Sequence, residues 1–579
     1  MSQPSTSEQP PAPAERDRLP MVGWFDPGQL VRTGLDVVIS AMFARNSDRR
    51  VLDALSHPGF DACDYSSRDE LWLDYVADTG DGWNSTYAVA HAVARPELGV
   101  EVDGVHRITK RGDVLVFGGD EVYPVASREA YERRLIAAYR TALPSLEPPY
   151  PRVFAIAGNH DWYDSLVAFT RIFCTGGKRR FAAWQTHQSR SYFAIKLPHG
   201  WWLIGTDVQL ESDIDDPQLE YFRKIADAMA PDDRVILCTA EPNWIYEQRY
   251  RQFDRAISER NLDFLQERVF ENRIVVYLAG DLHHYRRHSN DAGQHKITAG
   301  GGGAFLFPTH VDLDEVRELK DGYTYRTSFP APETSRKLSR RLLRFGWINP
   351  QFGKVTALLY LLFAMAIKVD IRQPGLRHGR QVVHDIIAGI LNSQIALLWG
   401  FLLLFGFYFF TDTHDEKFRR WGGLTHATAH LAAAFLLGWF GLYVAVTWLG
   451  RPLESISQIV VTGLVIALGG YIVGPTIMGT YLLVSMNWFG RHAGEFSALR
   501  CEDHKSWLRM HVGPTGDLRI HALGIDVVPR SWAEATPTAE APSLLVPADA
   551  RATAPKLVDY VEVRGAEAAK AGTPVRHHS

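Results

Sequence analysis

The sequence predicts an α/β sandwich of mixed sheets flanked by helices, followed by an all-α, multi-pass membrane domain. The first half of the chain contains three continuous apolar runs, each ending on glycine and then on polar residues, at 113–120, 153–161 and 274–284. Such runs are typical of strands buried on both faces of a layered α/β domain. Between residues 355 and 488 the apolar stretches become much longer, which favours membrane helices.

The N-terminal residues precede the α/β domain and carry no chemical motif. Residues 1–20 are polar and rich in proline, so we expect a disordered tail without the apolar core of a signal peptide. In the next segment, 21–60, residues 27–45 mix apolar and charged side chains in the pattern of an amphipathic helix. This helix could pack on the α/β domain or lie on a membrane, and packing is the simpler expectation.

Side chains that can bind metals directly follow the strand-like runs. Glycines before them let the backbone turn sharply, and the carboxyl edge of the strands is where α/β sheets bind ligands. The side chains after the three runs are Asp120, Asn159, His160, Asp161, Asp281 and His283. Two further runs, 73–77 and 234–240, lead to Asp78 and Glu241. Carboxylate, amide and imidazole groups that meet at one sheet edge indicate a metal site.

At these residues the chain resembles the calcineurin-like metallophosphoesterase superfamily. The ordered signature of that superfamily is Asp-x-His, Gly-Asp, Gly-Asn-His-Asp/Glu, a lone His, and Gly-His-x-His. Two blocks are intact, as Gly119-Asp120 and Gly158-Asn159-His160-Asp161. Three depart: Gly80 follows Asp78 where histidine is expected, Glu241 replaces the lone histidine, and Asp281 replaces the first histidine of the last block, which keeps His283. Any one block could be an ordinary turn, but five in order favour the resemblance.

The resemblance implies a phosphoesterase domain, here residues 61–330, that works with two divalent metal ions. Asp120 would bridge the two ions, because one carboxylate can hold two cations. The other implied ligands are Asp78 and His283 for one ion, with Asp81 as a candidate for the place of the missing histidine, and Asn159, Glu241 and Asp281 for the other. The second set is rich in oxygen donors, which favours Mn or Fe, with Zn or Mg as alternatives.

The resemblance also assigns catalytic groups. His160 would protonate the leaving oxygen or stabilise the transition state, and Asp161 would orient the ring of His160. His284 and His310 are further candidates for the wall of the pocket. Four glycines at 300–303 could bring backbone amides close to a phosphate, or could form a flexible turn.

The expected reaction is hydrolysis of a phosphomonoester or phosphodiester by metal-activated water, with lipid-linked and nucleotide substrates both open. The alternative is a catalytically inactive membrane sensor that binds metal or phosphate, since a protein can keep a scaffold and lose its chemistry. Two substituted ligand positions carry carboxylates, Glu241 and Asp281. This choice of residue favours an active site with an altered metal preference.

Residues 354–489 are expected to form a membrane domain of about four helices. The apolar stretches are 355–367, 386–410, 431–448 and 459–488, and about 20 apolar residues are needed to span a bilayer. The first stretch is short, so an interfacial helix is an alternative. The fourth contains Pro475, and we expect one kinked helix because each half alone is too short to span.

Charge predicts the orientation of this membrane domain. The basic cluster 335–344 lies in the juxtamembrane linker 331–353, and the positive-inside rule places such clusters in the cytoplasm. The chain has 4 cysteines, far apart and in no disulfide or metal spacing, as expected in a reducing compartment. We therefore expect a multi-pass protein of the cell membrane with a cytoplasmic catalytic domain, although the loop 368–380 is also basic.

The C-terminal residues are expected to form a small soluble segment, 490–533, with a hairpin around 513–516, and then a disordered tail, 534–579, rich in Ala, Pro, Glu and Thr. The net charge is -4, so no nucleic-acid partner is predicted. The expected partners are a phosphoester substrate and membrane lipids. The sequence leaves the oligomeric state open.

Overall fold

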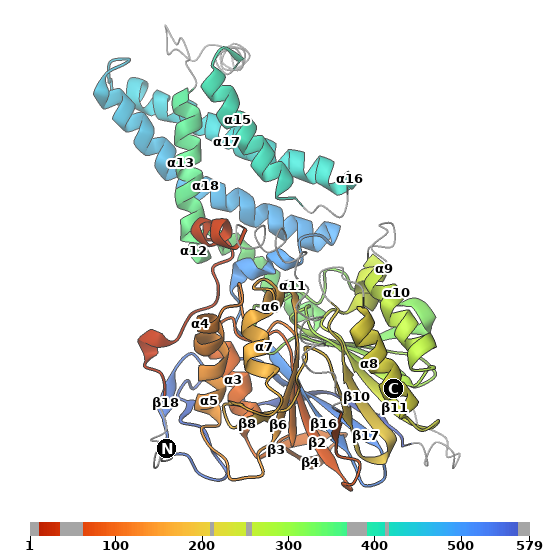
Figure 1. Ribbon diagram of the computed structural model, residues 1–579. Helices are drawn as coiled ribbons and strands as arrows, with labels where there is room; N and C mark the ends of the chain where they lie inside the picture. Colours follow the sequence, from red (N-terminus) through yellow and green to blue (C-terminus); the bar gives the residue numbers. More distant parts are fainter. Residues whose placement is uncertain are drawn as a thin grey trace. The chain divides into compact units, whose positions relative to one another are not determined.

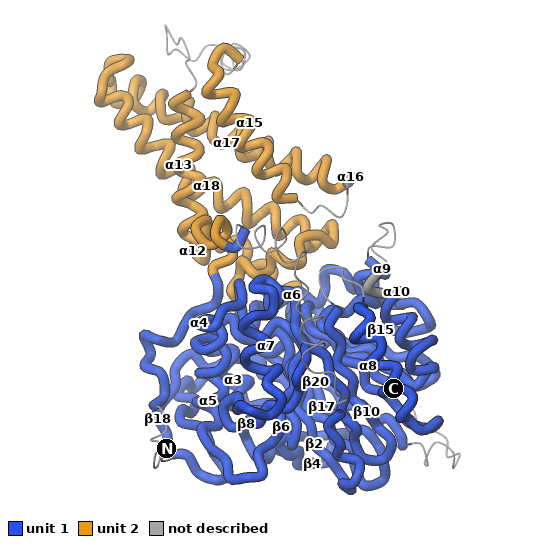
Figure 2. The backbone as a smooth tube through the Cα atoms, in the orientation of Figure 1, with its two compact units in different colours: residues 1–22, 33–335, 501–579 blue, residues 23–32, 336–500 orange. Residues whose placement is uncertain are grey.

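A computed structural model describes residues 11–34, 62–208, 214–249, 257–366, 391–411 and 416–565 (Figure 1). The chain forms two compact units (Figure 2). Unit 1 comprises residues 1–22, 33–335 and 501–579, and unit 2 comprises residues 23–32 and 336–500. Unit 1 is therefore built from chain on both sides of the helical segment of unit 2.

Sheet A of unit 1 is a mixed sheet with the strand order β1-β9-β10-β11-β12-β14-β13-β15. Its strands are β1 (Cys63–Asp64), β9 (Phe193–Lys196), β10 (Trp201–Gly205), β11 (Arg234–Cys238), β12 (Ile274–Ala279), β13 (Tyr285–Ser289), β14 (His295–Ala299) and β15 (Thr324–Phe329). The central strands β10, β11, β12 and β14 run parallel, whereas β9, β13 and β15 pair antiparallel with β10, β14 and β13.

Sheet B of unit 1 is also mixed and has the strand order β20-β17-β16-β2-β5-β6-β8-β7. Its strands are β2 (Leu71–Val76), β5 (Val114–Gly118), β6 (Arg152–Ile156), β7 (Arg180–Phe181), β8 (Trp184–Thr186), β16 (Lys505–Val512), β17 (Leu518–Ile525) and β20 (Lys556–Val563). The strands β2, β5, β6 and β8 run parallel, and β16 joins β2 antiparallel.

The two sheets share one apolar core and carry helices on their outer faces. Leu73 and Val116 of sheet B lie with Ile236 and Val276 of sheet A in the shared core. Neighbouring residues such as Val76 point to the other face, where they meet α3 (Trp83–Ala94), α5 (Ala137–Ala142) and α7 (Val167–Phe173). The outer face of sheet A packs on α8 (Asp216–Asp227), α9 (Asn243–Arg249) and α10 (Ile257–Phe264). The predicted α/β fold of mixed sheets flanked by helices is confirmed for unit 1.

Short elements connect these layers. They are η1 (Glu15–Asp17), β3 (Glu97–Val102), β4 (Val105–Lys110), α4 (Arg128–Ala130), η3 (Tyr131–Ile136), α6 (Asn159–Trp162), η4 (Pro198–Gly200), η5 (Leu265–Val269), η6 (Lys320–Gly322), β18 (Trp532–Glu534) and β19 (Leu545–Pro547). The expected N-terminal tail therefore contains one short helical turn. Of the expected amphipathic helix, residues 27–34 are helical, and its remainder lies outside the described residues.

The C-terminal residues correct two expectations. The hairpin of β16 and β17 exists, but it extends sheet B next to β2 and is no separate segment. The residues expected as a disordered tail contain the last residue of β18 and all of β19 and β20. Strand β20 pairs with β17 and buries Val561 and Val563 in the shared core. The composition suggested disorder because Ala, Pro, Glu and Thr are common in this segment, and only Val561 and Val563 of β20 are buried.

Unit 2 is helical. Its helices are α12 (Phe345–Ile348), α13 (Pro350–Ala366), α15 (Gln394–Phe409), α16 (Glu416–Phe418), α17 (Leu424–Tyr443) and α18 (Ile456–Phe489), with η7 (Arg340–Arg344), η8 (Arg419–Gly423), η9 (Val444–Trp448) and η10 (Gly494–Leu499). Helix α11 (Pro332–Ser339) leads into η7, so the expected juxtamembrane linker is largely helical. Close contacts hold the bundle together: Thr356 Oγ1 of α13 donates to the Gly470 carbonyl of α18 at 2.9 Å.

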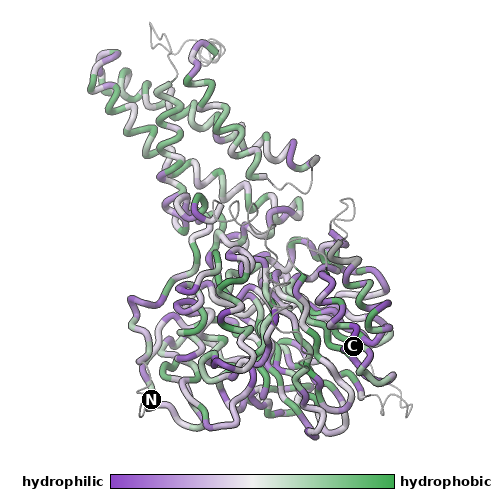
Figure 3. Tube along the Cα trace, viewed as in Figure 1, coloured by the Kyte–Doolittle hydropathy of each residue, from purple (hydrophilic) through white to green (hydrophobic). Residues whose placement is uncertain are grey.

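Two helices of unit 2 are long and apolar enough to cross a membrane, by length and composition. They are Arg419–Trp448 and Ile456–Phe489, whereas Pro350–Ala366 and Gln394–Phe409 are shorter. Figure 3 shows the apolar character of these helices. The fourth predicted stretch is one helix that passes through Pro475, as expected. The basic loop 368–380 lies outside the described residues, and the number of spans stays a prediction.

Candidate metal centre

The residues that follow the carboxyl ends of β2, β5 and β12 lie close together. Asp78 and Asp120 follow β2 and β5, and Asp281 follows β12; all three have positive φ, at 57°, 54° and 65°. The Asp281 amide donates to both carboxylate oxygens of Asp78, at 3.0 and 2.9 Å. A Cβ on Gly158 would lie 2.1 Å from Asp120 Oδ1, and one on Gly280 would lie 2.6 Å from Asp78 Oδ2. Glycine is needed at both positions because a side chain would displace these carboxylates.

The hydroxyl of Tyr123 lies at the centre of the first predicted ligand set. Tyr123 Oη is 3.1 Å from Asp78 Oδ1, 3.2 Å from Asp120 Oδ2 and 2.9 Å from His283 Nε2. The Nδ1 atom of His283 contacts the Phe305 carbonyl at 2.7 Å, so Nδ1 carries the proton and Nε2 is left as an acceptor. Three acceptors therefore converge on one point, where a single hydroxyl proton can satisfy only one of them at a time.

Tyr123 was missed by the sequence analysis, which weighed only aspartate, asparagine, glutamate and histidine. The available signal was its position, three residues after Asp120 on the same turn. Burial raises the pKa of Tyr123 well above its usual range. Burial and the neighbouring Asp120 and Asp281 likewise hold the pKa of Asp78 well above its usual range. A cation would relieve this crowding of buried acceptors. The chemistry of Asp78, Asp120, His283 and Tyr123 therefore suits a metal ion, although no ligand geometry for one is formed among the described residues.

The residues predicted for the second ion are not drawn together in the same way. Asn159 Nδ2 donates to Tyr163 Oη at 3.3 Å, and the Asp281 carboxylate accepts from Tyr246 Oη. Glu241 is half-buried at the turn after β11. In the part of the chain that the structure describes, no group of three or more His, Cys, Asp or Glu residues is arranged to hold a metal ion. The predicted two-ion ligand set therefore stays a prediction.

His160 and Asp161 lie at the start of α6, and each has its own partners. His160 Nδ1 contacts the Pro124 carbonyl at 2.6 Å, and the ring packs 4.4 Å from that of Tyr123 between centroids. Burial lowers the pKa of His160 to about 4. Asp161 instead accepts from the amides of Gly158 and Glu121, at 2.9 and 3.3 Å, and from Tyr131 Oη. The expected orienting contact between Asp161 and the His160 ring is thus replaced by the Pro124 carbonyl.

Two of the three additional candidates, Asp81 and His310, have hydrogen-bond partners. Asp81 accepts from the amides of Val22 and Phe305, at 2.7 and 3.2 Å, and burial raises the pKa of Asp81 to about 6. His310 Nδ1 contacts Ser335 Oγ at 2.8 Å. His284 is buried at the start of β13, and burial, with Arg286, lowers the pKa of its ring to about 3. Asp81 thus accepts hydrogen bonds from two backbone amides, whereas the sequence analysis considered it as a metal ligand in place of the missing histidine.

The glycine run 300–303 forms a loop that packs tightly against Asp78 and the end of β2. The amides of Gly302 and Ala304 donate to the carbonyls of Ala77 and Asp78, at 2.9 and 2.8 Å. A Cβ on Gly300 would lie 2.3 Å from Asp78 Oδ2, and one on Gly301 would lie 2.1 Å from Ser506 Oγ. Both earlier expectations, phosphate contact and a flexible turn, are replaced by tight packing.

Strand β16 forms hydrogen bonds with the loop that contains Gly301 and Ala304. The buried Lys505 Nζ donates to the Ala304 carbonyl at 2.7 Å, and the Ser506 amide donates to the Gly301 carbonyl at 2.9 Å. Burial lowers the pKa of Lys505. Because the carbonyl of the next residue, Phe305, accepts from His283, the C-terminal chain supports the position of His283 through one short loop.

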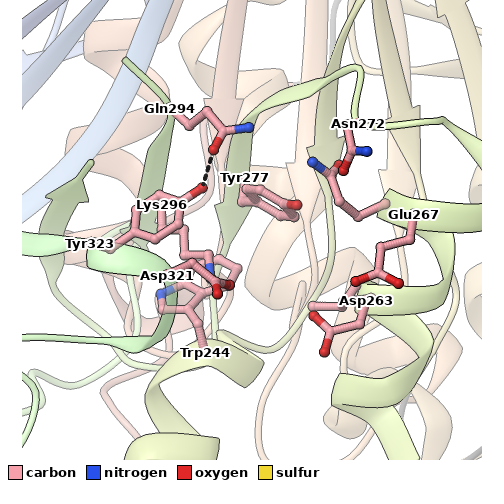
Figure 4. A pocket seen from close by; sticks show the side chains of 11 residues that line it. Trp244, Asp263, Glu267, Asn272, Tyr277, Gln294, Lys296, Asp321 and Tyr323 are labelled. Atoms are coloured by element: carbon pink, nitrogen blue, oxygen red, sulfur yellow. Dashed lines mark hydrogen bonds between the residues drawn. The ribbon is translucent and has the colours of Figure 1, made fainter. Parts of the chain in front are cut away.

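A separate cavity of about 290 Å³ lies between α9, α10 and sheet A (Figure 4). Lys296 Nζ lies 4.3 Å from the ring centroid of Tyr323, and Tyr323 Oη donates to Gln294 Oε1 at 3.2 Å. Trp244, on α9, also lines it. The residues predicted for the metal site are not among those that line this cavity.

Comparison with known proteins agrees with the resemblance inferred from the motifs. Residues 71–285 match the family model described as calcineurin-like phosphoesterase. No match was found among curated proteins. A solved structure of GAP50, the anchor in the inner membrane complex of Plasmodium, is 14% identical, with a TM-score of 0.30, and the match covers 41% of this chain and 74% of that chain. The family match therefore supports, for residues 71–285, a likeness to the calcineurin-like phosphoesterase family.

Proposed function

We propose that this protein is a membrane-anchored, metal-dependent phosphoesterase that hydrolyses a phosphomonoester or phosphodiester. The observation that carries the proposal is the convergence of Asp78, Asp120 and His283 on one point within a calcineurin-like phosphoesterase domain. The intact Gly-Asn-His-Asp block beside it supports an active enzyme. The alternative, an inactive metal- or phosphate-binding sensor, would keep the ligand set without turnover.

The first metal would be held by Asp78, Asp120, His283 and the phenol oxygen of Tyr123. A second would be held by Asn159, Glu241 and Asp281, with Asp120 shared between both positions. Divalent metal in such a site lowers the pKa of bound water to near neutrality and polarises phosphoryl oxygens. The donors are mostly oxygens, which suit Mn, Fe or Mg better than Zn; Mn or Fe is our first expectation.

The chain's own residues would supply the remaining chemistry. The backbone amide of His160 donates to Asp120 Oδ1 at 2.9 Å, which orients the bridging carboxylate. Because Nδ1 of His160 is engaged by the Pro124 carbonyl, Nε2 would be the nitrogen that exchanges a proton with the leaving oxygen. Phe305 and Phe307 pack against the His283 ring, at 4.4 and 4.7 Å between centroids, and shield it from water.

Membrane anchoring is supported by the outward faces of the long helices. Only 22% and 17% of the most apolar windows of Arg419–Trp448 and Ile456–Phe489 are buried. Large apolar residues face outward along the helices, among them Leu436, Phe440, Leu464, Leu468 and Ile472. A core helix of a soluble protein would bury them, whereas lipid contact accounts for this exposure.

The order of the units limits the topology. The chain leaves unit 1 at residue 335 and returns to it at residue 501, and one compact unit lies on one side of a membrane. Residues 336–500 therefore cross an even number of times, either with the two long helices alone or with α13 and α15 as well. The basic cluster 335–344 favours the cytoplasm for unit 1.

The test is hydrolysis by the full chain, purified in an uncharged detergent. We expect Mn²⁺ or Fe²⁺ to support hydrolysis of p-nitrophenyl phosphate or bis-p-nitrophenyl phosphate. Asp120→Asn should abolish it, whereas Asp314→Asn should not, because the Asp314 side chain is 99% exposed. Bound metal without hydrolysis of either ester would favour the sensor. Absence of bound metal would refute the metal-dependent enzyme and the metal-binding sensor, and would leave the phosphate-binding sensor.

A further inference from the structure

The helical connection into unit 2 presents a strongly basic face. The exposed cations are Arg336, Lys337, Arg340, Arg341 and Arg344. Among the described residues, none of these five side chains forms an ion pair or a hydrogen bond. Their spacing of three and four residues places them along one side of a helix. A run of unpaired cations this dense repels itself and therefore attracts anions.

The opposite side of this segment is fixed to unit 2. Leu342 and Phe345 are 0% and 1% exposed, and Phe345 packs edge-on against Phe25 and Phe352, at 5.1 and 5.2 Å between centroids. A Cβ on Gly479 of α18 would lie 2.2 Å from the Leu342 carbonyl. The segment that carries the basic face is therefore packed, by its opposite side, against α18, the longest apolar helix.

Two apolar side chains stand exposed beside the cations. Leu343 is 61% exposed and Trp347 is 90% exposed. A fully exposed indole is costly in water but favoured at the boundary between lipid headgroups and acyl chains. The combination of cations, an exposed leucine and an exposed tryptophan next to apolar helices has the composition of a lipid-binding surface.

We propose that residues 336–347 bind the headgroups of anionic phospholipids, with Trp347 and Leu343 inserted at the acyl boundary. Charge complementarity selects the occupant: each cation near an anionic lipid surface contributes about 1 kcal/mol. A free phosphate would satisfy the cations but leave both apolar side chains in water, which is why the lipid is the occupant. The proposal rests on the membrane anchoring proposed above and is independent of hydrolysis.

The experiment counts lipids that stay bound to the full chain. The protein is purified in an uncharged detergent, equilibrated with mixed micelles of phosphatidylglycerol and phosphatidylcholine, and analysed by native mass spectrometry. We expect the wild type to retain phosphatidylglycerol selectively. In Arg340→Gln/Arg341→Gln/Arg344→Gln its apparent affinity should fall on the order of 100-fold, because about 1 kcal/mol is lost for each of the three cations.

A charge-matched control is Arg128→Gln/Lys178→Gln/Arg268→Gln, which removes three exposed cations from unit 1. It should retain lipid as the wild type does. Trp347→Ala should weaken retention of long-chain phosphatidylglycerol while preserving the preference over phosphatidylcholine. All the substituted side chains are exposed, so unchanged unfolding midpoints are expected and will verify folding.

Equal phosphatidylglycerol retention by the basic-face variant and the wild type would overturn the proposal. So would displacement of the lipid by millimolar inorganic phosphate, which would identify the face as a phosphate site. Hydrolysis of p-nitrophenyl phosphate is measured on the same variants and should be unchanged. Failure of hydrolysis in every sample would refute the phosphoesterase proposal alone, without bearing on lipid retention.

Discussion

The return of the C-terminal chain to sheet B can be tested at one buried ion pair. Arg509 of β16 lies directly opposite Asp74 of β2. Its Nε and Nη2 atoms lie 2.7 and 3.3 Å from the two Asp74 oxygens, and Nη2 also donates to the Val93 carbonyl at 3.1 Å. The side chains are 0% and 1% exposed. Asp74 is four residues before Asp78, so this pair ties the C-terminal strand to the strand that leads to the proposed metal ligand Asp78.

Arg509→Met removes the cation and leaves the Asp74 carboxylate buried. Breaking a buried pair on one side costs about 3–5 kcal/mol, because an uncompensated charge remains. Arg519→Met, on the neighbouring strand β17, is the matched control: its pair with Glu562 is 2.9 Å long, but the side chains are 28% and 42% exposed. An exposed pair is worth about 0–1 kcal/mol.

The assay is urea unfolding of the purified full chain in uncharged detergent, followed by tryptophan fluorescence. Arg509→Met should lower the free energy of unfolding of unit 1 by several times the loss in Arg519→Met. Asp74→Asn/Arg509→Met should recover part of the loss, since no buried charge is left unpaired. If Arg509→Met and Arg519→Met unfold at the same urea concentration, β16 does not belong to sheet B and the proposed support of the metal site by the C-terminal chain fails.

Three further outcomes test the site and its surroundings. Tyr123→Phe removes the oxygen at the centre of the first ligand set, so metal affinity measured by chelator titration should fall at least about tenfold, a loss of roughly 1.4 kcal/mol; unchanged affinity would remove Tyr123 from the donor set. Lys505→Met removes the donor to the Ala304 carbonyl, and should weaken metal binding through His283 while Lys178→Met, an exposed lysine, leaves it unchanged. Burial lowers the pKa of His521 to about 4, below its unfolded value of about 6.5. The stability that the neutral His521 ring gives the folded state is therefore fully present above pH 6.5 and is lost as the pH falls from 6.5 towards 4. The wild type should therefore lose about 2 kcal/mol more than His521→Asn between pH 7 and pH 5, and parallel stability profiles for the two proteins would contradict this.

The sequence determined the α/β class and the edge of the sheets at which the site lies. Runs such as β5 and β12 are apolar on both faces, and each ends on glycine and an aspartate, Asp120 or Asp281. These are local properties, because strand burial and a sharp turn depend on neighbouring residues. The long apolar helix through Pro475 was predictable for the same reason.

Only the tertiary structure decided which distant segments complete the site. Nothing near Lys505 or Arg509 in the chain indicates that β16 lies beside β2. The paired residues Asp74 and Arg509 are 435 positions apart in the sequence. The role of Tyr123 depends equally on three acceptors from three different strand ends. Strand pairing across a long insertion depends on side-chain packing and burial over the whole sheet. The local sequence of one strand therefore does not indicate which strand it will pair with.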